Sequence, residues 1–326
     1  MSSVTSKLLT SKDGTVVYAD AIGDPAKQSL VFVHGVGLSA AVFNNIFSDV
    51  RYSSEFYMIR YDMRGHGRSG KPDTEEAYAS IKYAEDYLAV AQGFSLNKPV
   101  FVGWSMGGMS LNYFYRPVHS CFPSATVVAD IAQHLPRDTL SGVVYLMGLP
   151  YIGPIMGVVG TPTVRSFVPG LCSNDDVTAY IKNKAAFVDS LFTDPDSVPY
   201  DLKCHWIGVS MAQGPATAKL IFGRKQDPTA LFAWAKEGLP LLVLGGTADK
   251  QMIVHKIAEE MNVHFTNQTV RIFDGLGHAL FYEDLAGVMA AIVEFTRKVG
   301  KILLPIAGDG NLQQTFNLEI TNEQRT

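Results

Sequence analysis

The first 130 residues alternate short β-rich runs with helical stretches, and this alternation limits the fold more than any other feature of the chain. Such a pattern is typical of a mostly parallel sheet with helices on both faces, so we predict an α/β fold. Residues that follow parallel strands gather at one edge of the sheet, where functional groups are expected. The strand-like runs are Thr15 to Ala21, Leu30 to Val33, Glu55 to Tyr61, Pro99 to Val102 and Ala125 to Ala129.

The pattern changes near residue 133. From about Gln133 to Trp234 we find no strand-like run, and proline, glycine and helical segments take over. Strand-like runs return at Leu239 to Leu244 and Thr269 to Phe273, and the apolar spacing of Asp284 to Val299 predicts a closing helix. We therefore predict a core in two parts, 1–132 and 236–300, a mainly helical cap at 133–235, and a C-terminal extension at 301–326 to which we assign no role.

Composition excludes several classes of protein. The chain has 326 residues, of which 47% are hydrophobic, enough to bury a large core. Lys+Arg number 27 against 31 Asp+Glu with no basic block, so we expect no nucleic-acid partner. The three cysteines form no C-x-x-C pair, which indicates neither a disulfide framework nor a zinc site. With no apolar leader at the N-terminus, we expect a cytoplasmic location.

One charge-free segment, Leu140 to Val164, is long enough to cross a bilayer. Three prolines interrupt it, and each would break hydrogen bonds that a lipid-exposed helix needs. We therefore interpret it as a buried loop-and-helix region and predict no transmembrane segment. Its larger side chains include Tyr145, Met147, Tyr151 and Met156. They favour an apolar substrate pocket, although packing within the cap explains them equally well.

The strongest local motif lies at residues 103–107, which read Gly-Trp-Ser-Met-Gly. The motif follows the strand Pro99 to Val102 and precedes a helix predicted at Met109 to Tyr115. A strand that turns directly into a helix strains the turning residue, and flanking glycines remove the Cβ atoms that would collide. This placement predicts that Ser105 presents its hydroxyl as a nucleophile.

A serine nucleophile needs a general base, which in turn needs an orienting acid. His278 follows the strand Thr269 to Phe273 in a glycine-rich loop, and we predict that it is the base. Asp249 follows the strand Leu239 to Leu244 and is the predicted acid, although an aspartate there is also suited to capping a helix. Asp130, at the end of another apolar run, competes for this role, but it leads into the cap and we expect it to anchor that junction.

Acyl transfer also requires donors for a developing oxyanion. Residues 34–37, His-Gly-Val-Gly, end a strand at the same predicted edge, and the N–H of Val36 is one candidate. The second is the N–H of Met106, directly after the nucleophile at a helix N-terminus. The adjacent residues Gly35 and Trp104 are predicted to contact the substrate. The glycine turn lacks the spacing and lysine of a phosphate-binding loop, so we expect no nucleotide and predict no cofactor or metal.

A glycine-rich turn at residues 62–69, Asp-Met-Arg-Gly-His-Gly-Arg-Ser, also carries an acid, a histidine and two arginines. All of it precedes Ser105, and charged residues in such turns commonly fix the turn through local hydrogen bonds. We therefore predict a structural role.

Taken together, the motifs resemble those of the α/β-hydrolase superfamily over about residues 10–300. The matching positions are His34-Gly35, residues 62–67, residues 103–107, Asp249 and Gly277-His278. The resemblance implies a sheet of about eight strands with a helical cap between strands six and seven. It also implies a serine hydrolase acting on an ester, thioester or amide.

Four alternatives stay open at this point. Relatives with a serine triad also transfer acyl groups, close lactones or cleave C–C bonds. A hydrolase fold can also serve as a receptor for a small ligand with little turnover. The sequence assigns no oligomeric state.

Overall fold

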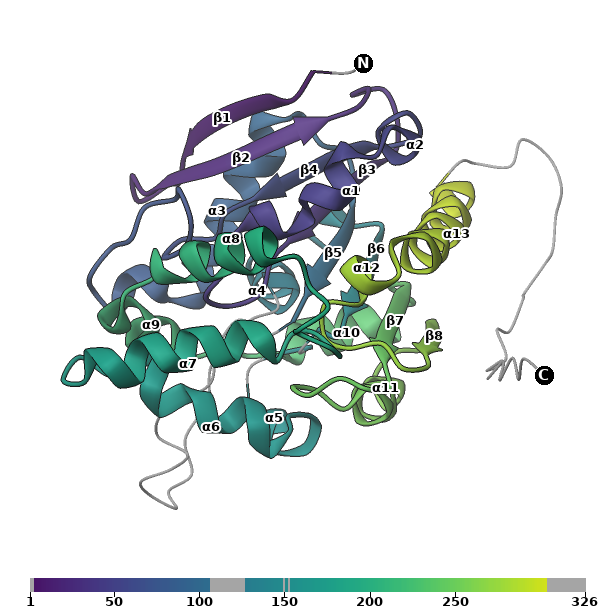
Figure 1. Ribbon diagram of the computed structural model, residues 1–326. Coiled ribbons are helices and arrows are strands. Elements are labelled where there is room, and N and C mark those ends of the chain that lie inside the picture. Colours follow the sequence, from purple (N-terminus) through teal and green to yellow (C-terminus); the bar gives the residue numbers. More distant parts are fainter. Residues whose placement is uncertain (1–2, 106–126, 149, 152, 304–326) are drawn as a thin grey trace, which may run out of the picture.

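The computed structural model describes residues 3–105, 127–148, 150–151 and 153–303, which form one eight-stranded sheet and the helices around it (Figure 1). The strand order is β1-β2-β4-β3-β5-β6-β7-β8. The strands are β1 (Thr5–Thr10), β2 (Val16–Ile22), β3 (Ser29–Val33), β4 (Tyr57–Tyr61), β5 (Val100–Trp104), β6 (Gly142–Leu146), β7 (Leu241–Gly246) and β8 (Gln268–Phe273). The predicted α/β fold is confirmed.

The sheet is parallel from β4 to β8 and antiparallel at its β1 edge. Every residue of β3, β4, β5, β6 and β7 is buried, as expected for strands covered on both faces. β1 is mostly exposed and pairs only with β2. Consequently β3, β5, β7 and β8 end at one edge, where the residues that follow them meet.

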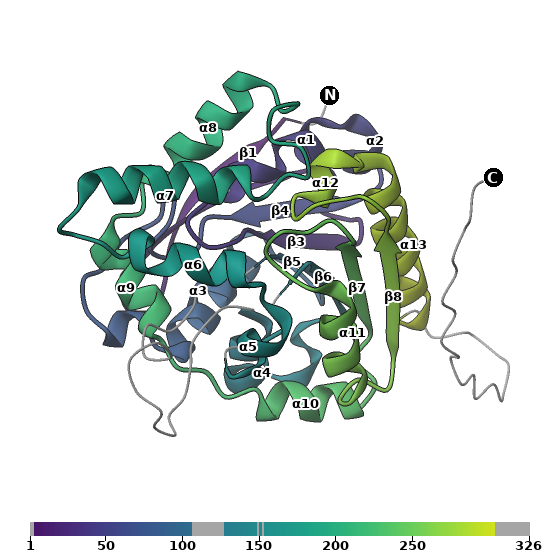
Figure 2. The same ribbon diagram turned by 60° about the horizontal axis from the view of Figure 1, so that its bottom comes forward.

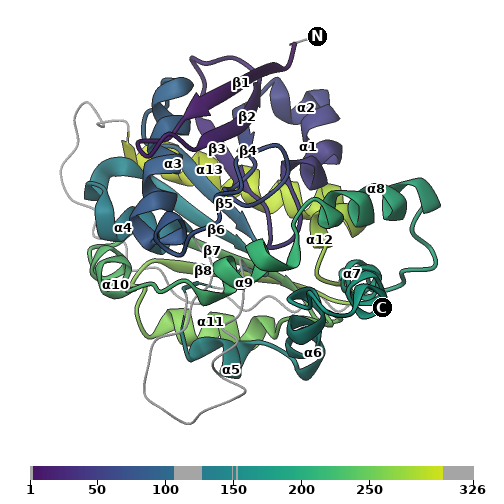
Figure 3. The ribbon, with the colours of Figure 1, turned by 90° about the vertical axis from the view of Figure 1, so that its left-hand side faces the viewer.

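Helices cover both faces of this sheet (Figures 2 and 3). Helix α3 contacts α4, which contacts α10, and these three lie on one face. Helix α13 contacts β6 and β7 from the other face, where α1 and α2 also lie. The bounds are α1 (Asn44–Ser48), α2 (Val50–Ser53), α3 (Ser80–Gly93), α4 (Val127–His134), α10 (Thr229–Lys236), α11 (Val254–Asn262), α12 (Leu280–Glu283) and α13 (Leu285–Leu303).

Between β6 and α10 lie five helices within residues 155–223 of the described chain, and we call these residues the helical insertion. It comprises α5 (Ile155–Val159), α6 (Pro162–Leu171), α7 (Val177–Asp189), α8 (Tyr200–Met211) and α9 (Pro215–Gly223). Hydrogen bonds tie it and the loops between its helices to the loops at the carboxyl edge of the sheet. Thr161 N–H donates to Gln251 (2.9 Å), and Ala279 N–H donates to Leu191 (2.8 Å).

Two strand predictions were wrong. Residues 127–129 of the predicted strand 125–129 begin α4, while residues 125 and 126 lie outside the described part. Val127 to Ala132 are all buried on α4. The pattern of a short buried run does not distinguish a helix from a strand, which is why the prediction failed. β6 lies inside the range 133–235, which we predicted to be free of strands, and it pairs with β5 and β7. The division into core and cap otherwise stays a prediction.

The charge-free segment Leu140 to Val164 thus divides into β6, α5 and the start of α6. Within the described ranges, no helix is long and apolar enough to cross a membrane. The helix predicted at Met109 to Tyr115 and most of the extension 301–326 lie outside the described residues.

Candidate active site

Ser105 directly follows β5 and has a φ of +64°, in the left-handed region that side chains rarely adopt. Its N–H donates to the carbonyl of Leu146 (3.0 Å), so the sheet holds its backbone. Gly35 comes so close that a Cβ there would lie 2.8 Å from Ser105 Cβ and 3.1 Å from its Oγ. The strained turn that the motif predicted is therefore present, and it depends on a glycine from another strand end.

The hydroxyl of Ser105 hydrogen-bonds Nε2 of His278, which lies in the loop after β8. Nδ1 of the same imidazole lies 2.6 Å from Oδ2 of Asp249, which follows β7. Both the His278 and the Asp249 side chains are fully buried. The structure therefore brings the three predicted residues, from three strand ends, into one hydrogen-bonded chain.

Asp249 is fixed by more than the histidine. Its Oδ1 accepts the backbone N–H groups of Gln251 (2.6 Å) and Met252 (3.0 Å). The two roles considered for this aspartate, helix cap and triad acid, are therefore compatible, since each carboxylate oxygen makes one set of contacts.

The loop that carries His278 is braced on two sides. Trp104 Nε1 donates to the carbonyl of His278 (2.9 Å). Glu283 accepts the N–H of Gly277 (2.5 Å) and the N–H of Thr193 (2.7 Å), which joins the loop to the chain between α7 and α8. Sequence reasoning did not identify Glu283, because no motif surrounds it.

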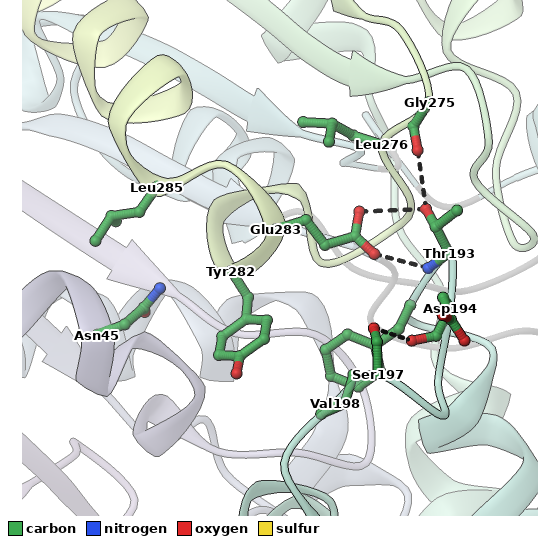
Figure 4. A pocket seen from close by; sticks show the side chains of 11 residues that line it. Asn45, Thr193, Asp194, Ser197, Val198, Gly275, Leu276, Tyr282, Glu283 and Leu285 are labelled. Carbon is green, nitrogen blue, oxygen red and sulfur yellow. Dashed lines mark hydrogen bonds between the residues drawn. The ribbon is translucent and has the colours of Figure 1, made fainter.

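Glu283 and Thr193 also line a pocket of about 550 Å³ beside this loop (Figure 4). The pocket's other walls include Asn45, Leu276 and Tyr282. Neither Ser105 nor His278 lines it, so this pocket is separate from the nucleophile.

The predicted oxyanion donors are only partly described. Val36 is buried in the turn after β3, and its N–H has no hydrogen-bond acceptor among the residues that the structure describes. Gly37, next in the turn, has a φ of +71°. Met106 lies outside the described residues. Val36 N–H is therefore without an acceptor within the described ranges, and the oxyanion roles of both Val36 and Met106 stay predictions.

Hydrogen bonds connect the turn at residues 62–69 to the segment that carries Val36. Asp62 accepts N–H groups from Ala40 (2.8 Å) and Arg68 (2.8 Å), and Met63 N–H donates to Nε2 of His34 (3.1 Å). His34 Nδ1 lies 2.7 Å from the carbonyl of Gly35. These contacts favour the structural role that we predicted for this turn.

Asp130, the other candidate for the triad acid, makes its contacts with residues outside the triad. It lies on α4, where its carboxylate pairs with Arg224 and accepts the Ser80 hydroxyl (2.6 Å). Both partners of the Asp130–Arg224 pair are fully buried. Asp130 therefore connects α4 to the end of α9.

Gly35 and Trp104 were predicted to contact the substrate. Trp104 is buried, and its ring packs against Trp206 (5.9 Å between centroids) and Phe281 (5.0 Å). These contacts and the bond to His278 give it a clear packing role, and its contact with substrate stays a prediction. Across the described ranges, no group of three His, Cys, Asp or Glu side chains is arranged to hold a metal ion.

Comparison with known proteins agrees with this architecture. Residues 30–291 match the model of the alpha/beta hydrolase family. A non-heme chloroperoxidase of Streptomyces lividans is 25% identical over 281 residues, which cover 83% of this chain and 92% of that protein. An uncharacterised protein of Mycobacterium tuberculosis is 24% identical over 272 residues, covering 82% of this chain and 74% of its own.

Solved structures share the fold. The esterase RhEst1 from Rhodococcus sp. ECU1013 superposes with a TM-score of 0.74 at 23% identity, covering 90% of this chain and 99% of its own. An esterase from Exiguobacterium antarcticum gives a TM-score of 0.67 at 16% identity, with 90% and 100% covered. The family match extends over most of the chain, and the sheet order and helix placement agree with it. The chain therefore belongs to the α/β hydrolase family.

Proposed function

We propose that this chain is a serine hydrolase that cleaves a carboxylic ester or thioester of a small, largely apolar substrate through an acyl-enzyme on Ser105. The observation that carries the proposal is the buried hydrogen-bonded chain from Asp249 through His278 to Ser105. A serine at a φ of +64° supports the same chemistry, as does the adjacent glycine turn, whose Val36 N–H has no acceptor among the described residues.

In the proposed reaction, Nε2 of His278 takes the proton of Ser105 as Oγ attacks the carbonyl carbon. The Asp249 carboxylate holds Nδ1–H and so keeps Nε2 free to accept that proton. The N–H groups of Val36 and Met106 receive the developing negative charge. His278 then protonates the departing alcohol or thiol. A water that gives its proton to His278 attacks the acyl-enzyme and releases the acid and free Ser105.

The apolar character of the substrate rests on the surroundings of the site. Trp104, Trp206 and Phe281 form an aromatic cluster beside His278. An apolar cluster next to the general base keeps water away from it and favours apolar acyl groups. The cytoplasmic location and the lack of a cofactor stay predictions.

Labelling with a fluorophosphonate probe, followed by peptide mapping, tests the proposal. We expect one modified site, Ser105, and no labelling of a Ser105→Ala variant that melts cooperatively. A hydrolase-fold receptor with an inactive serine would not react, and that result would contradict the proposal.

Product analysis with and without an added alcohol separates hydrolysis from acyl transfer. A new ester formed at the expense of the free acid would show that an alcohol replaces water as the acceptor.

A further inference from the structure

Helix α7 carries a lysine on its buried face. Lys184 is 1% exposed and shares that face with Phe187 and Val188, three and four residues further on. Its Nζ donates to the carbonyl of Ser210 on α8 (2.8 Å). An ammonium group can donate three hydrogen bonds, and lysine is rarely buried without a partner of opposite charge.

Such a partner is absent from the described part of the chain, where no carboxylate forms an ion pair with Lys184. Of the two longer segments that are not described, residues 106–126 contain neither aspartate nor glutamate, whereas residues 304–326 contain Asp309, Glu319 and Glu323. Cys172 is a charged neighbour only as a thiolate, and burial raises the pKa of its thiol to about 12. Burial lowers the pKa of Lys184 to about 8, so the amine is still mostly protonated at neutral pH. A buried cation without a counter-charge is costly.

The lysine faces the turn beside the nucleophile. A Cβ on Gly37 would lie 3.7 Å from Nζ of Lys184 and 3.7 Å from Oε1 of Gln213. Gly37 is one residue beyond Val36 and two beyond Gly35, which touches Ser105. The ammonium group of Lys184 therefore lies next to the turn that carries Val36.

A second polar group nearby also lacks a partner. Nδ1 of His66 lies 3.0 Å from the carbonyl of Arg64, so Nδ1 carries the hydrogen and Nε2 is an acceptor. Nε2 is buried and has no hydrogen-bond partner among the described residues. Burial lowers the pKa of His66, and the neighbouring groups His34 and Lys184 lower it further, which indicates that Lys184 is close. As an acceptor, Nε2 marks a polar region on this side of the turn but cannot itself bind an anion, so the ligand argued below is assigned to Lys184 alone.

We propose that Lys184 binds a carboxylate carried by the substrate, so that the preferred substrates are mainly apolar esters with one acidic group a few bonds from the scissile carbonyl. The proposal rests on the proposed esterase function, because it places the acid relative to an ester on Ser105. A carboxylate supplies the opposite charge that Lys184 does not find among the described residues, and it accepts the remaining N–H donors.

Kinetics with matched esters test this selectivity. The acidic esters are monoethyl glutarate and monoethyl adipate, with the carboxylate on the acyl side, and carboxymethyl butyrate, with the carboxylate on the alcohol side. Their neutral counterparts are ethyl pentanoate, ethyl hexanoate and ethyl butyrate. The wild type should favour at least one acidic ester over its counterpart in kcat/KM. Lys184→Met should lower that ratio about tenfold to a hundredfold, since a charge-assisted hydrogen bond is lost.

Two further variants control for the fold and for general charge. Lys182→Met removes an exposed lysine from the same helix and should keep the wild-type ratio. Lys184→Arg keeps the charge and should retain part of the preference. An unchanged ratio in a Lys184→Met protein that melts cooperatively would overturn the proposal, and so would a wild type without preference for any acidic ester.

A binding measurement separates this proposal from the proposed function. Calorimetry with glutarate and adipate needs no turnover, and binding should weaken at least tenfold in Lys184→Met but not in Lys182→Met. If the serine fails to react with the fluorophosphonate while binding still depends on Lys184, the esterase function fails and the anion site stands. If the wild type binds neither acid, the anion site is overturned, whatever the serine does.

Discussion

Asp249 divides its two carboxylate oxygens between His278 and the backbone. Oδ2 lies 2.6 Å from Nδ1 of His278, and Oδ1 accepts N–H groups from the chain two and three residues further on. The carboxylate cannot rotate without losing one set of bonds. The imidazole is thereby held in the tautomer that leaves Nε2 free for Ser105.

Replacing Asp249 with asparagine should cripple turnover in a folded protein. The amide can keep accepting backbone N–H groups through its oxygen, but its NH₂ would then face Nδ1 and favour the wrong tautomer. In a serine protease the equivalent change lowers kcat about ten-thousand-fold, and we expect a loss of up to that size. Ester hydrolysis and a thermal melt measure both effects. A variant with most of its activity would remove Asp249 from the mechanism.

In contrast to Asp249→Asn, Asp130→Asn should lower the stability of the protein and leave its turnover largely intact. The substitution leaves Arg224 charged and buried without its partner, which typically costs about 3–5 kcal/mol. Urea denaturation should show that loss, while kcat at a temperature where the variant is folded should stay within a fewfold of wild type. A large loss of kcat without a loss of stability would instead assign the triad acid to Asp130.

Gly35→Ala tests the close approach to the nucleophile. The new Cβ would lie 2.8 Å from Ser105 Cβ, so one of the two turns must shift. A displacement of about 1 Å at reacting groups costs on the order of a hundredfold in rate, and we expect kcat/KM to fall by that much.

Gly208→Ala is the matched control for this substitution. Gly208 is exposed in the interior of α8, and a Cβ there has no atom within 4 Å. Alanine should stabilise the helix by about 0.5–1 kcal/mol and leave kcat/KM as it is. Equal activity losses in the two variants would show that the approach of Gly35 to Ser105 has no special role.

The strand ends were the most predictable part of the molecule. β3, β5 and β7 are short and apolar, β8 is a short β-rich run, glycines lie within or just after these strands, and the chemistry follows them in sequence, so local patterns sufficed. The edge strand β1 was not predicted because its residues are almost all exposed and show no alternation of apolar and polar side chains. β6 was not separated from the apolar region around it for the opposite reason, since its neighbours are equally apolar.

Lys184 and Glu283 show where local patterns stop. Each lies next to a residue that is distant in sequence. Lys184 lies beside the turn at Gly37, and Glu283 accepts a hydrogen bond from Thr193. A lysine aligned with Phe187 and Val188 on an apolar helix face was a detectable signal, because a charge in a buried stripe needs a reason. The groups that surround the lysine depend on how the helical insertion packs against the rest of the protein, and a local sequence pattern does not predict that packing.

The buried histidines His34 and His66 lie behind the Val36 turn, with ring centroids 5.0 Å apart. Burial lowers the pKa of both imidazoles, and for His66 the shift is large. Asp62 opposes the shift at His34, whereas Lys184 and Lys71 add to it at His66. Both rings are therefore neutral in the folded protein at a pH where exposed histidines are already charged.

This arrangement predicts that the free energy of unfolding falls as the pH drops below about 6.5, the ordinary pKa of histidine. In that range the unfolded chain binds a proton at each of these histidines and the folded chain does not, so acid favours unfolding by up to about 1.4 kcal/mol per pH unit for each ring. The effect should be absent above pH 7, where the two imidazoles are neutral in both the folded and the unfolded chain.

Urea denaturation at pH 7.5, 6.5 and 5.5 measures how the free energy of unfolding changes with pH, and His66→Gln should make this slope shallower. His255→Gln, which replaces an exposed histidine on α11, should leave it unchanged. Parallel slopes for wild type and His66→Gln would show that His66 takes up its proton without unfolding the chain.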